Sequence, residues 1–316
     1  MTTFQPTIAA IDLGSNSFHL VVAIVNDGAL EILVQKSSRV QLALNMRAGV
    51  IASQALDAGE QCLADFLAII TAHNADLVRV VGTAALRQAK NAQDIITTIE
   101  SQLDKKVEII EGVEEASLIY SAVAAQTADI NARLVIDVGG ASTELAISDA
   151  DGQRVCSLPF GCVSVLQQFM PNSEVSSASM TAAIDYCSEV ISQYRAQLEP
   201  LGQHTAIGCS GSLQAIAVVA ARYGGDTDIV AYQPVADACD VLLTDFEQIN
   251  DIKIAGLPED RQKLFTSGVA IVLALLQSLP INGIEVSRAA LREGLLVDYL
   301  FRQSQKPVEL RISKQN

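Results

Sequence analysis

Two copies of one short pattern, IDLGSNSFHL at residues 11–20 and IDVGGASTEL at residues 136–145, decide the fold of this chain. The copies align without gaps, and their Ile, Asp, Gly, Ser and Leu positions are identical in register. Each copy reads as an apolar strand ending at an Asp, a turn of small residues, and a second apolar strand. The repeat predicts two related domains, each presenting a carboxylate and a small-residue loop.

The residues of this pattern suit phosphate chemistry. An Asp at the end of a buried strand is placed to hold Mg²⁺ directly or through water. The small residues that follow let backbone N–H groups approach an anion closely, and Ser and Asn side chains add donors. A single Asp-x-Gly turn would read as an ordinary hairpin, but two copies in register indicate paired phosphate loops.

The rest of the chain alternates between strand and helix patterns. Apolar runs predict strands at 7–11, 18–25, 29–36, 77–81, 107–110, 134–136, 144–148 and 205–207. Helical spacing of apolar residues predicts helices at 54–70, 92–102, 114–125, 177–198, 213–221, 234–248, 264–277 and 291–301. This alternation predicts an α/β fold with hairpins as well as crossovers in each half, closely packed around a cleft.

Composition limits the kinds of partner. Half of the 316 residues are hydrophobic and 18% are charged, which excludes a disordered chain. The net charge is −15 and no Lys/Arg run occurs, so neither nucleic acid nor a negatively charged membrane is an expected partner. Aromatic residues make up only 4%, so we expect cores of Ala, Val, Ile and Leu.

Processing and metal signals are also limited. Residues 1–6 lack a cationic segment, and Asp12 interrupts the apolar stretch that follows, so we expect no signal peptide. The apolar run at 269–276 is far shorter than the ~20 residues of a membrane span. Six scattered cysteines without a CxxC pair predict reduced, buried thiols, and three distant histidines predict no zinc site. The chain reads as a cytoplasmic protein.

The chain resembles the exopolyphosphatase/guanosine pentaphosphate phosphatase (Ppx/GppA) family. The matching stretches occur in family order: AAIDLGSNSFHLVVA (9–23), VVGTAALRQAKN (80–91), IIEGVEEASLIYSAV (109–123), LVIDVGGASTEL (134–145), FGCVS (160–164), GCSGS (208–212) and ALREGLL (290–296). The resemblance implies two ribonuclease-H-like domains of the actin, sugar-kinase and Hsp70 superfold with an interdomain cleft. It places the first domain at 1–126, completed by a C-terminal helix in 290–316, and the second at 127–289.

The resemblance also implies which residues bind phosphate. Gly14, Ser15 and Asn16, after Asp12, match the first phosphate loop. The second loop matches at Gly139, Gly140 and Ser142. GCSGS, with Gly208, Ser210 and Gly211, resembles a third small-residue loop whose role is less defined.

The remaining site residues follow from the same resemblance. Glu115 matches the proposed catalytic base, whereas Glu114 fits a carboxylate stabilised by the helix dipole. Arg87 matches a phosphate-contacting arginine, although the residue alone would read as a surface cation. Asp137 and Glu144, together with Asp12, are the implied ligands of Mg²⁺, the expected cofactor.

Two local departures from the family pattern stand out. Ala141 replaces a third Gly found in many members, which is a mild change. Arg288-Ala289 replaces the Gly-Gly or Asp-Gly that usually precedes ALREG, so close approach of a ligand is not expected there. The chain also lacks room for the HD-type C-terminal region of longer relatives, and we expect the short form.

The implied activity is hydrolysis of a terminal phosphoanhydride, in inorganic polyphosphate or in the 5′-triphosphate of guanosine pentaphosphate. The substrate is therefore polyphosphate or a (p)ppGpp-type nucleotide, and a homodimer is compatible. Alternatives are an ATP-dependent small-molecule kinase of the same superfold, a non-catalytic nucleotide-driven scaffold, and an inactive (p)ppGpp or polyphosphate sensor. The kinase is disfavoured because no adenosine pocket or sugar-orienting Asp can be placed in the sequence.

Overall fold

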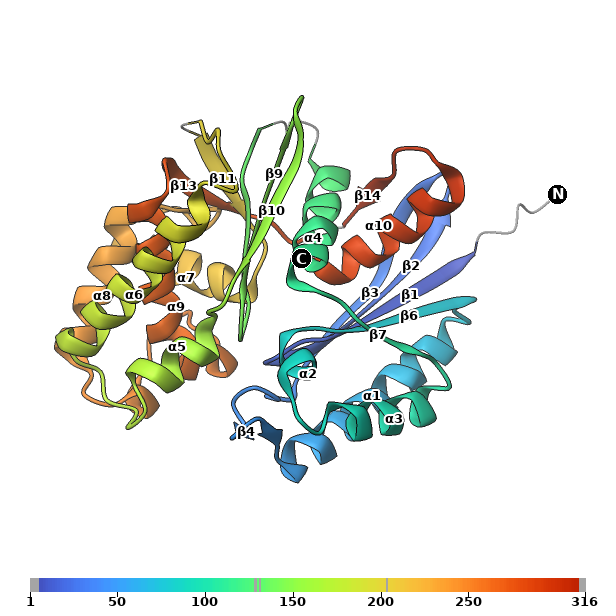
Figure 1. The fold of residues 1–316 in the computed structure, drawn as a ribbon, viewed down its shortest axis with the longest axis horizontal. Helices are drawn as coiled ribbons and strands as arrows, with labels where there is room; N and C mark the ends of the chain where they lie inside the picture. The colour runs from blue at the N-terminus through green and yellow to red at the C-terminus, as the bar shows by residue number, and fades with distance from the viewer. Residues whose placement is uncertain (1–5, 128–129, 131, 203, 313–316) are drawn as a thin grey trace. The chain divides into compact units, whose positions relative to one another are not determined.

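The computed structural model describes residues 6–127, 130, 132–202 and 204–312. The chain divides into two compact units, Met1–Ile130 with Ala289–Asn316 and Asn131–Arg288. Each unit contains one large mixed sheet and its own helices (Figure 1). The α/β class predicted from the sequence is confirmed.

The sheet of the first unit has the order β14-β3-β2-β1-β6-β7. Its strands are β1 (Thr7–Leu13), β2 (Ser17–Asn26), β3 (Ala29–Arg39), β6 (Leu77–Gly82), β7 (Val107–Ile109) and β14 (Glu309–Arg311). The antiparallel β1–β2–β3 meander follows from the hairpin turns in the sequence, and β6 and β7 add in parallel. A two-stranded ribbon, β4 (Met46–Arg47) with β5 (Val50–Ile51), lies outside this sheet.

Helices cover both faces of the first sheet (Figure 1). On one face lie α1 (Ser53–Ala72) and α3 (Ala92–Leu103), and α2 (Ala84–Gln88) follows β6. On the other lie α4 (Gly112–Gln126) and α10 (Leu291–Ser304), which pack against each other and, through α10, against β1. The last helix of the chain therefore belongs to the first unit.

The sheet of the second unit has the order β10-β9-β8-β11-β13-β12. Its strands are β8 (Val135–Val138), β9 (Thr143–Asp149), β10 (Gly152–Leu158), β11 (His204–Gly208), β12 (Ile229–Val230) and β13 (Ile281–Val286). The run β10-β9-β8-β11-β13 repeats the run β3-β2-β1-β6-β7, with the same antiparallel meander and the same parallel additions. The internal repeat of the sequence is thus a repeat of whole domains.

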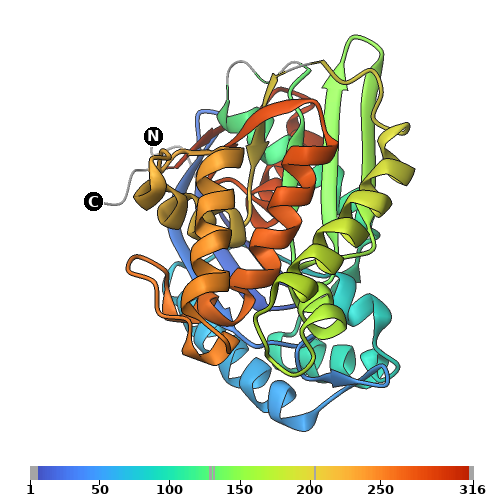
Figure 2. The same ribbon diagram turned by 90° about the vertical axis from the view of Figure 1, so that its left-hand side faces the viewer.

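The helices of the second unit gather around α9 (Glu259–Ser278), which contacts α5 (Cys162–Phe169), α6 (Ser177–Arg195), α7 (Gly211–Ala220) and α8 (Tyr232–Asp245). Figure 2 shows α6 in yellow-green and α8 and α9 in orange, running alongside one another. The apolar run at 269–276, which the sequence predicts as helix, lies in the C-terminal half of α9 and is buried from 269 to 275. Short 3₁₀ turns lie at Ala221–Tyr223 and Ile249–Asp251.

Several predicted boundaries shift, and the prediction lacks six of the observed strands (β4, β5, β10, β12, β13 and β14) and two of the observed helices (α2 and α5). The helix predicted at 264–277 begins at Glu259, because its first turn is polar and breaks the apolar spacing. The strand β13 is absent from the prediction, since its sequence INGIEV contains Asn and Gly, which are uncommon in strands. The helices α2 and α5 were also missed, because helices of one or two turns show no clear periodicity.

The cysteines behave as predicted. All six are buried, and none forms a disulfide bond. Burial raises the pKa of the Cys156 thiol to about 12 and that of Cys162 to about 11, so both are neutral at physiological pH. In the parts of the chain that the structure describes, no helix has the length and apolarity to cross a bilayer.

Gly294 sets how closely α10 approaches α4. A Cβ placed at Gly294 would overlap the carbonyl oxygen of Leu118 and lie 2.7 Å from its carbonyl carbon. The obstacle is backbone of a neighbouring helix, so it cannot be relieved by a side-chain rotation. The Gly of ALREGLL therefore has a packing role.

We expect Gly294→Ala to lower the free energy of unfolding by about 1–3 kcal/mol, because the helices must separate. Urea unfolding followed by circular dichroism measures the change. Gly268→Ala in α9 is the matched control, since a Cβ there would meet Ile216 Cδ1 at an ordinary 3.4 Å. That variant should be neutral or gain up to about 1 kcal/mol from helix propensity. Equal midpoints for the two variants would contradict the packing role.

Candidate active site

Each unit carries one of the two predicted loops at the same structural position. In the first unit Asp12 pairs with His19 and Leu13 with Phe18 across β1 and β2. In the second unit the equivalent pairs are Asp137 with Glu144 and Val138 with Thr143 across β8 and β9. The repeat therefore preserves strand register, and both Asp residues stand at the strand end that leads into a loop.

A glycine in each loop lies against the backbone three residues later. A Cβ at Gly14 would lie 2.7 Å from the Ser17 carbonyl oxygen, and one at Gly139 would lie 2.9 Å from that of Ser142. No larger residue fits without widening the turn. This is the physical reason for the shared Gly of the two sequence copies.

The carbonyl groups of the first loop are held from outside. The Ala43 N–H donates to the Ser15 carbonyl at 2.9 Å, and the Val40 and Gln41 N–H groups donate to the Asn16 carbonyl at 3.2 and 2.8 Å. The Ala85 N–H, in the first turn of α2, donates to Ser15 Oγ at 3.2 Å. Within the described residues, the N–H groups of Ser15 and Asn16 have no protein acceptor.

The second loop is held in the same way by the start of α5. The Cys162 N–H donates to the Gly139 carbonyl at 2.9 Å, and the Val163 and Ser164 N–H groups donate to the Gly140 carbonyl at 2.7 and 3.3 Å. As far as the chain is described, the N–H groups at positions 140–142 donate to no protein acceptor. Both loops thus commit carbonyl oxygens to the protein and leave N–H groups available, which is the arrangement that binds anions.

Gly161 permits the contact between α5 and the second loop. A Cβ at this position would lie 2.6 Å from the Gly139 carbonyl oxygen and 2.7 Å from the Ala141 nitrogen. Thr143 Oγ1 donates to the Phe160 carbonyl at 2.8 Å, which ties β9 to the same segment. The stretch FGCVS therefore supports the loop at 139–142, a role that sequence alone did not assign.

The third loop, GCSGS, has a counterpart in the first unit. Both β6 and β11 end in a glycine, Gly82 or Gly208, that is followed by a helix. A Cβ at either glycine would lie under 3 Å from a leucine of that helix, Leu86 or Leu213. This second repeat does not appear when the two halves of the sequence are aligned without gaps, because the leucine lies four residues after Gly82 but five residues after Gly208.

The carboxylates of the second unit lie in a row across three strands. Asp137, Glu144 and Ser157 are neighbours on β8, β9 and β10, and Ser157 Oγ donates to Glu144 Oε1 at 2.8 Å. Residues directly opposite on antiparallel strands share a face, so the two carboxylates lie side by side. The first unit has Asp12 and His19 at the equivalent places, and Arg292 Nη1 lies 3.0 Å from His19 Nδ1.

Burial changes the acidity of Asp137. Desolvation raises the pKa of its carboxyl from 3.8 to about 6. Across the described residues, no three His, Cys, Asp or Glu side chains converge to hold a metal ion by themselves. A hard cation at Asp137 and Glu144 would therefore take further oxygen ligands from water and phosphate, which is the usual coordination of Mg²⁺.

This shift predicts how stability depends on pH without metal. Since the folded state holds the Asp137 proton more tightly than the unfolded state, this group's stabilisation is complete below pH 3.8 and is lost as pH rises through about 6. The loss amounts to at most about 3 kcal/mol. Asp137→Asn should remove this fall, so that the melting temperature of the variant exceeds that of the wild type at pH 8 in EDTA. Asp185→Asn, at an exposed site on α6, should leave the pH profile unchanged.

The predicted base lies on the first turn of α4. Glu115 is 7% exposed, whereas Glu114 beside it points to solvent. Burial of a carboxylate needs compensation, and helix N-termini provide part of it. The two neighbours therefore differ: Glu114 is a solvated helix carboxylate and Glu115 is a buried group.

Arg87 lies in the last turn of the short helix α2. Its Nη1 donates to the Ile110 carbonyl at 2.6 Å, and its Nε lies 3.8 Å from Glu111 Oε2. These contacts tie α2 to the segment that leads into α4 and Glu115. A guanidinium has five N–H donors, so contact with phosphate, as predicted, is compatible with the bond to Ile110.

Comparison with known proteins gives the relationship. The sequence profile of the Ppx/GppA phosphatase family matches residues 21–303. This chain belongs to the Ppx/GppA phosphatase family. The resemblance found in the sequence motifs is confirmed.

Curated relatives of this chain are named after guanosine pentaphosphate hydrolysis. The chain is 33% identical over 309 residues to a guanosine-5'-triphosphate,3'-diphosphate pyrophosphatase of Photobacterium profundum, covering 97% of this chain and 62% of the relative. A protein of the same name from Aeromonas hydrophila is 35% identical over 303 residues, covering 94% of this chain and 60% of the relative. The chain thus spans about three-fifths of the length of these curated relatives.

Solved structures of the family confirm the fold. An exopolyphosphatase from Cytophaga hutchinsonii superposes with a TM-score of 0.82 at 24% identity, covering 93% of this chain and 97% of that one. The Aquifex aeolicus member of the Ppx/GppA family superposes with a TM-score of 0.78 at 23% identity, covering 96% and 100%.

Proposed function

We propose that this protein hydrolyses terminal phosphoanhydrides and releases orthophosphate. The observation that carries the proposal is the pair of loops at 14–16 and 139–142. In each loop carbonyl groups accept hydrogen bonds from other segments of the protein, while N–H groups stay available beside an Asp. Membership of the Ppx/GppA phosphatase family supports the same chemistry. We propose guanosine pentaphosphate as the first substrate to test, because curated relatives are named guanosine-5'-triphosphate,3'-diphosphate pyrophosphatase. Polyphosphate is the second substrate to test.

The proposed roles follow from the chemistry of each group. Gly14, Ser15 and Asn16 in one unit, and residues 139–142 in the other, bind phosphate oxygens through backbone N–H groups and hydroxyls. Glu115 orients and deprotonates the attacking water. Arg87 offsets negative charge on the phosphate.

We propose Mg²⁺ as the cofactor, with Asp137 and Glu144 as its protein ligands and Asp12 as a further candidate. The adjacent carboxylates of Asp137, which is partly buried, and Glu144, which is buried, fit a hard divalent cation, and Ser157 fixes the orientation of Glu144. When bound, Mg²⁺ would neutralise charge on the phosphate oxygens. We retain a cytoplasmic location and a homodimer as predictions.

The test is phosphate release by the purified protein with Mg²⁺, comparing guanosine pentaphosphate, short polyphosphate, long polyphosphate and ATP. We expect release from guanosine pentaphosphate or short polyphosphate, and loss of release in EDTA. Because the net charge is −15, long polyphosphate should be the poorer polymer. Magnesium-dependent transfer from ATP to a sugar, with no release from the other substrates, would establish the kinase alternative instead.

A further inference from the structure

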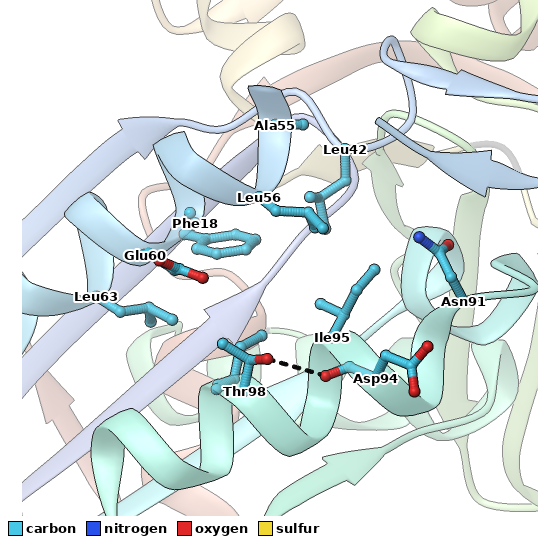
Figure 3. Close-up of a pocket in the computed structure, with 12 residues that line it drawn as sticks. Phe18, Leu42, Ala55, Leu56, Glu60, Leu63, Asn91, Asp94, Ile95 and Thr98 are labelled. Carbon is cyan, nitrogen blue, oxygen red and sulfur yellow. Dashed lines mark hydrogen bonds between the residues drawn. The ribbon is translucent and has the colours of Figure 1, made fainter. Parts of the chain in front are cut away.

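A cavity of about 230 Å³ lies in the first unit between α1 and α3, and none of its lining residues is one assigned to catalysis or phosphate binding (Figure 3). Its floor is apolar and buried, with Phe18, Leu42, Leu63, Ile95 and Ile99 each at most 6% exposed. For comparison, an apolar cavity of about 150 Å³ binds benzene. This cavity therefore has room for a two-ring organic molecule.

The rim of the cavity carries negative charge only. Glu60 on α1 and Asp94 on α3 are exposed lining residues from its two helical walls (Figure 3). None of its twelve lining residues is Lys or Arg. Asn91, also a lining residue, is held in place by its amide, which exchanges two hydrogen bonds of 3.1 Å with the backbone of Ile51.

We propose that this cavity binds a small organic ammonium ion. The apolar body of the ligand fills the space beside Phe18 and Ile95, and its ammonium group lies between the carboxylates of Glu60 and Asp94. An apolar floor provides affinity and a small number of polar groups provides selectivity, as in most ligand sites. An organic anion would be repelled by the same rim and by the net charge of the chain.

The cavity adjoins the support of the first phosphate loop. Phe18 lies two residues after the last residue of that loop, Asn16. Leu42 belongs to the segment whose N–H groups at positions 40, 41 and 43 donate to the carbonyls of Ser15 and Asn16. A ligand packed against Leu42 would restrain this segment. Occupancy should therefore slow amide hydrogen exchange at positions 40, 41 and 43, which also locates the ligand.

The binding test uses three indole probes that differ in charge: tryptamine (cationic), tryptophol (neutral) and indole-3-acetate (anionic). The chain contains no tryptophan, so indole fluorescence reports the probe alone. We expect tryptamine to bind about fivefold more tightly than tryptophol at low salt, and indole-3-acetate to bind most weakly. Equal affinities, or no binding of tryptamine, would overturn the proposal.

Two variants test the site itself. The rim variant Glu60→Gln with Asp94→Asn should bring tryptamine and tryptophol to equal affinity. Asp57→Asn, at an exposed position on α1 outside the cavity lining, should change nothing. Gly59→Leu should fill the cavity and abolish binding of all three probes, because a Cβ there already lies 3.4 Å from the Phe18 ring.

The rim variant alters only exposed side chains, so we expect it to fold. It therefore tests the role of the two carboxylates even if Gly59→Leu fails to fold. If the rim variant kept the wild-type preference for tryptamine, the proposal would be wrong. None of these measurements uses phosphate release, so their outcome is independent of the proposed function.

Discussion

Glu115→Gln is expected to lower the rate of phosphate release by about 10²–10⁴-fold while leaving substrate affinity nearly unchanged. The amide keeps the size of the side chain but cannot accept a proton from water. Because the substitution is isosteric, the first turn of α4 should keep its structure. Steady-state kinetics with the best substrate, together with binding of a non-hydrolysable analogue, measure the two quantities separately.

Glu114→Gln is the matched control for this experiment. It makes the same chemical change at the adjacent position, but that side chain points to solvent. We expect it to retain activity within about twofold, since a carboxylate at a helix N-terminus contributes only about 0.3–1 kcal/mol to stability. Wild-type turnover in Glu115→Gln, or equal losses in the two variants, would remove Glu115 from the role of base.

Gly161→Ala is expected to reduce kcat/KM by about 100-fold, although the residue is assigned no contact with the substrate. The added methyl group would occupy the space now taken by the Gly139 carbonyl oxygen and the Gly140 and Ala141 backbone. The loop must then move away from the start of α5, and its N–H groups lose the positions that suit phosphate.

The control for Gly161→Ala is Gly202→Ala in the same unit. A Cβ at Gly202 has only His204 Nδ1 nearby, at 3.9 Å. This variant should keep full activity. Circular dichroism and a melting curve would show that Gly161→Ala remains folded. A folded Gly161→Ala protein with wild-type kinetics would mean that contact with α5 does not position the loop.

The sequence predicted most of the secondary structure, and the errors have physical causes. Long amphipathic helices such as α1 and α3 were found within two residues of their ends, because their apolar spacing is regular. The strand β13 was missed because it relies on burial between β11 and β12, which overrides the poor strand propensity of its Asn and Gly. Short helices such as α5 depend on their contacts with other segments, here the loop at 139–142. The sequence does not show which segments those are.

The two small-residue loops that are proposed to bind phosphate were located from the sequence alone. Each is built from ten contiguous residues, and a tight hairpin between two apolar strands is fixed by local backbone sterics, so its signal survives in the order of residues. What holds those loops was decided only by the tertiary structure. The segment at 40–43 holds the first loop, and the start of α5 at Gly161 holds the second. The contact of Gly294 with α4 and the cavity between α1 and α3 likewise bring together residues that are distant in sequence. These contacts depend on how closely whole elements pack, and close packing leaves no periodic pattern in a single sequence.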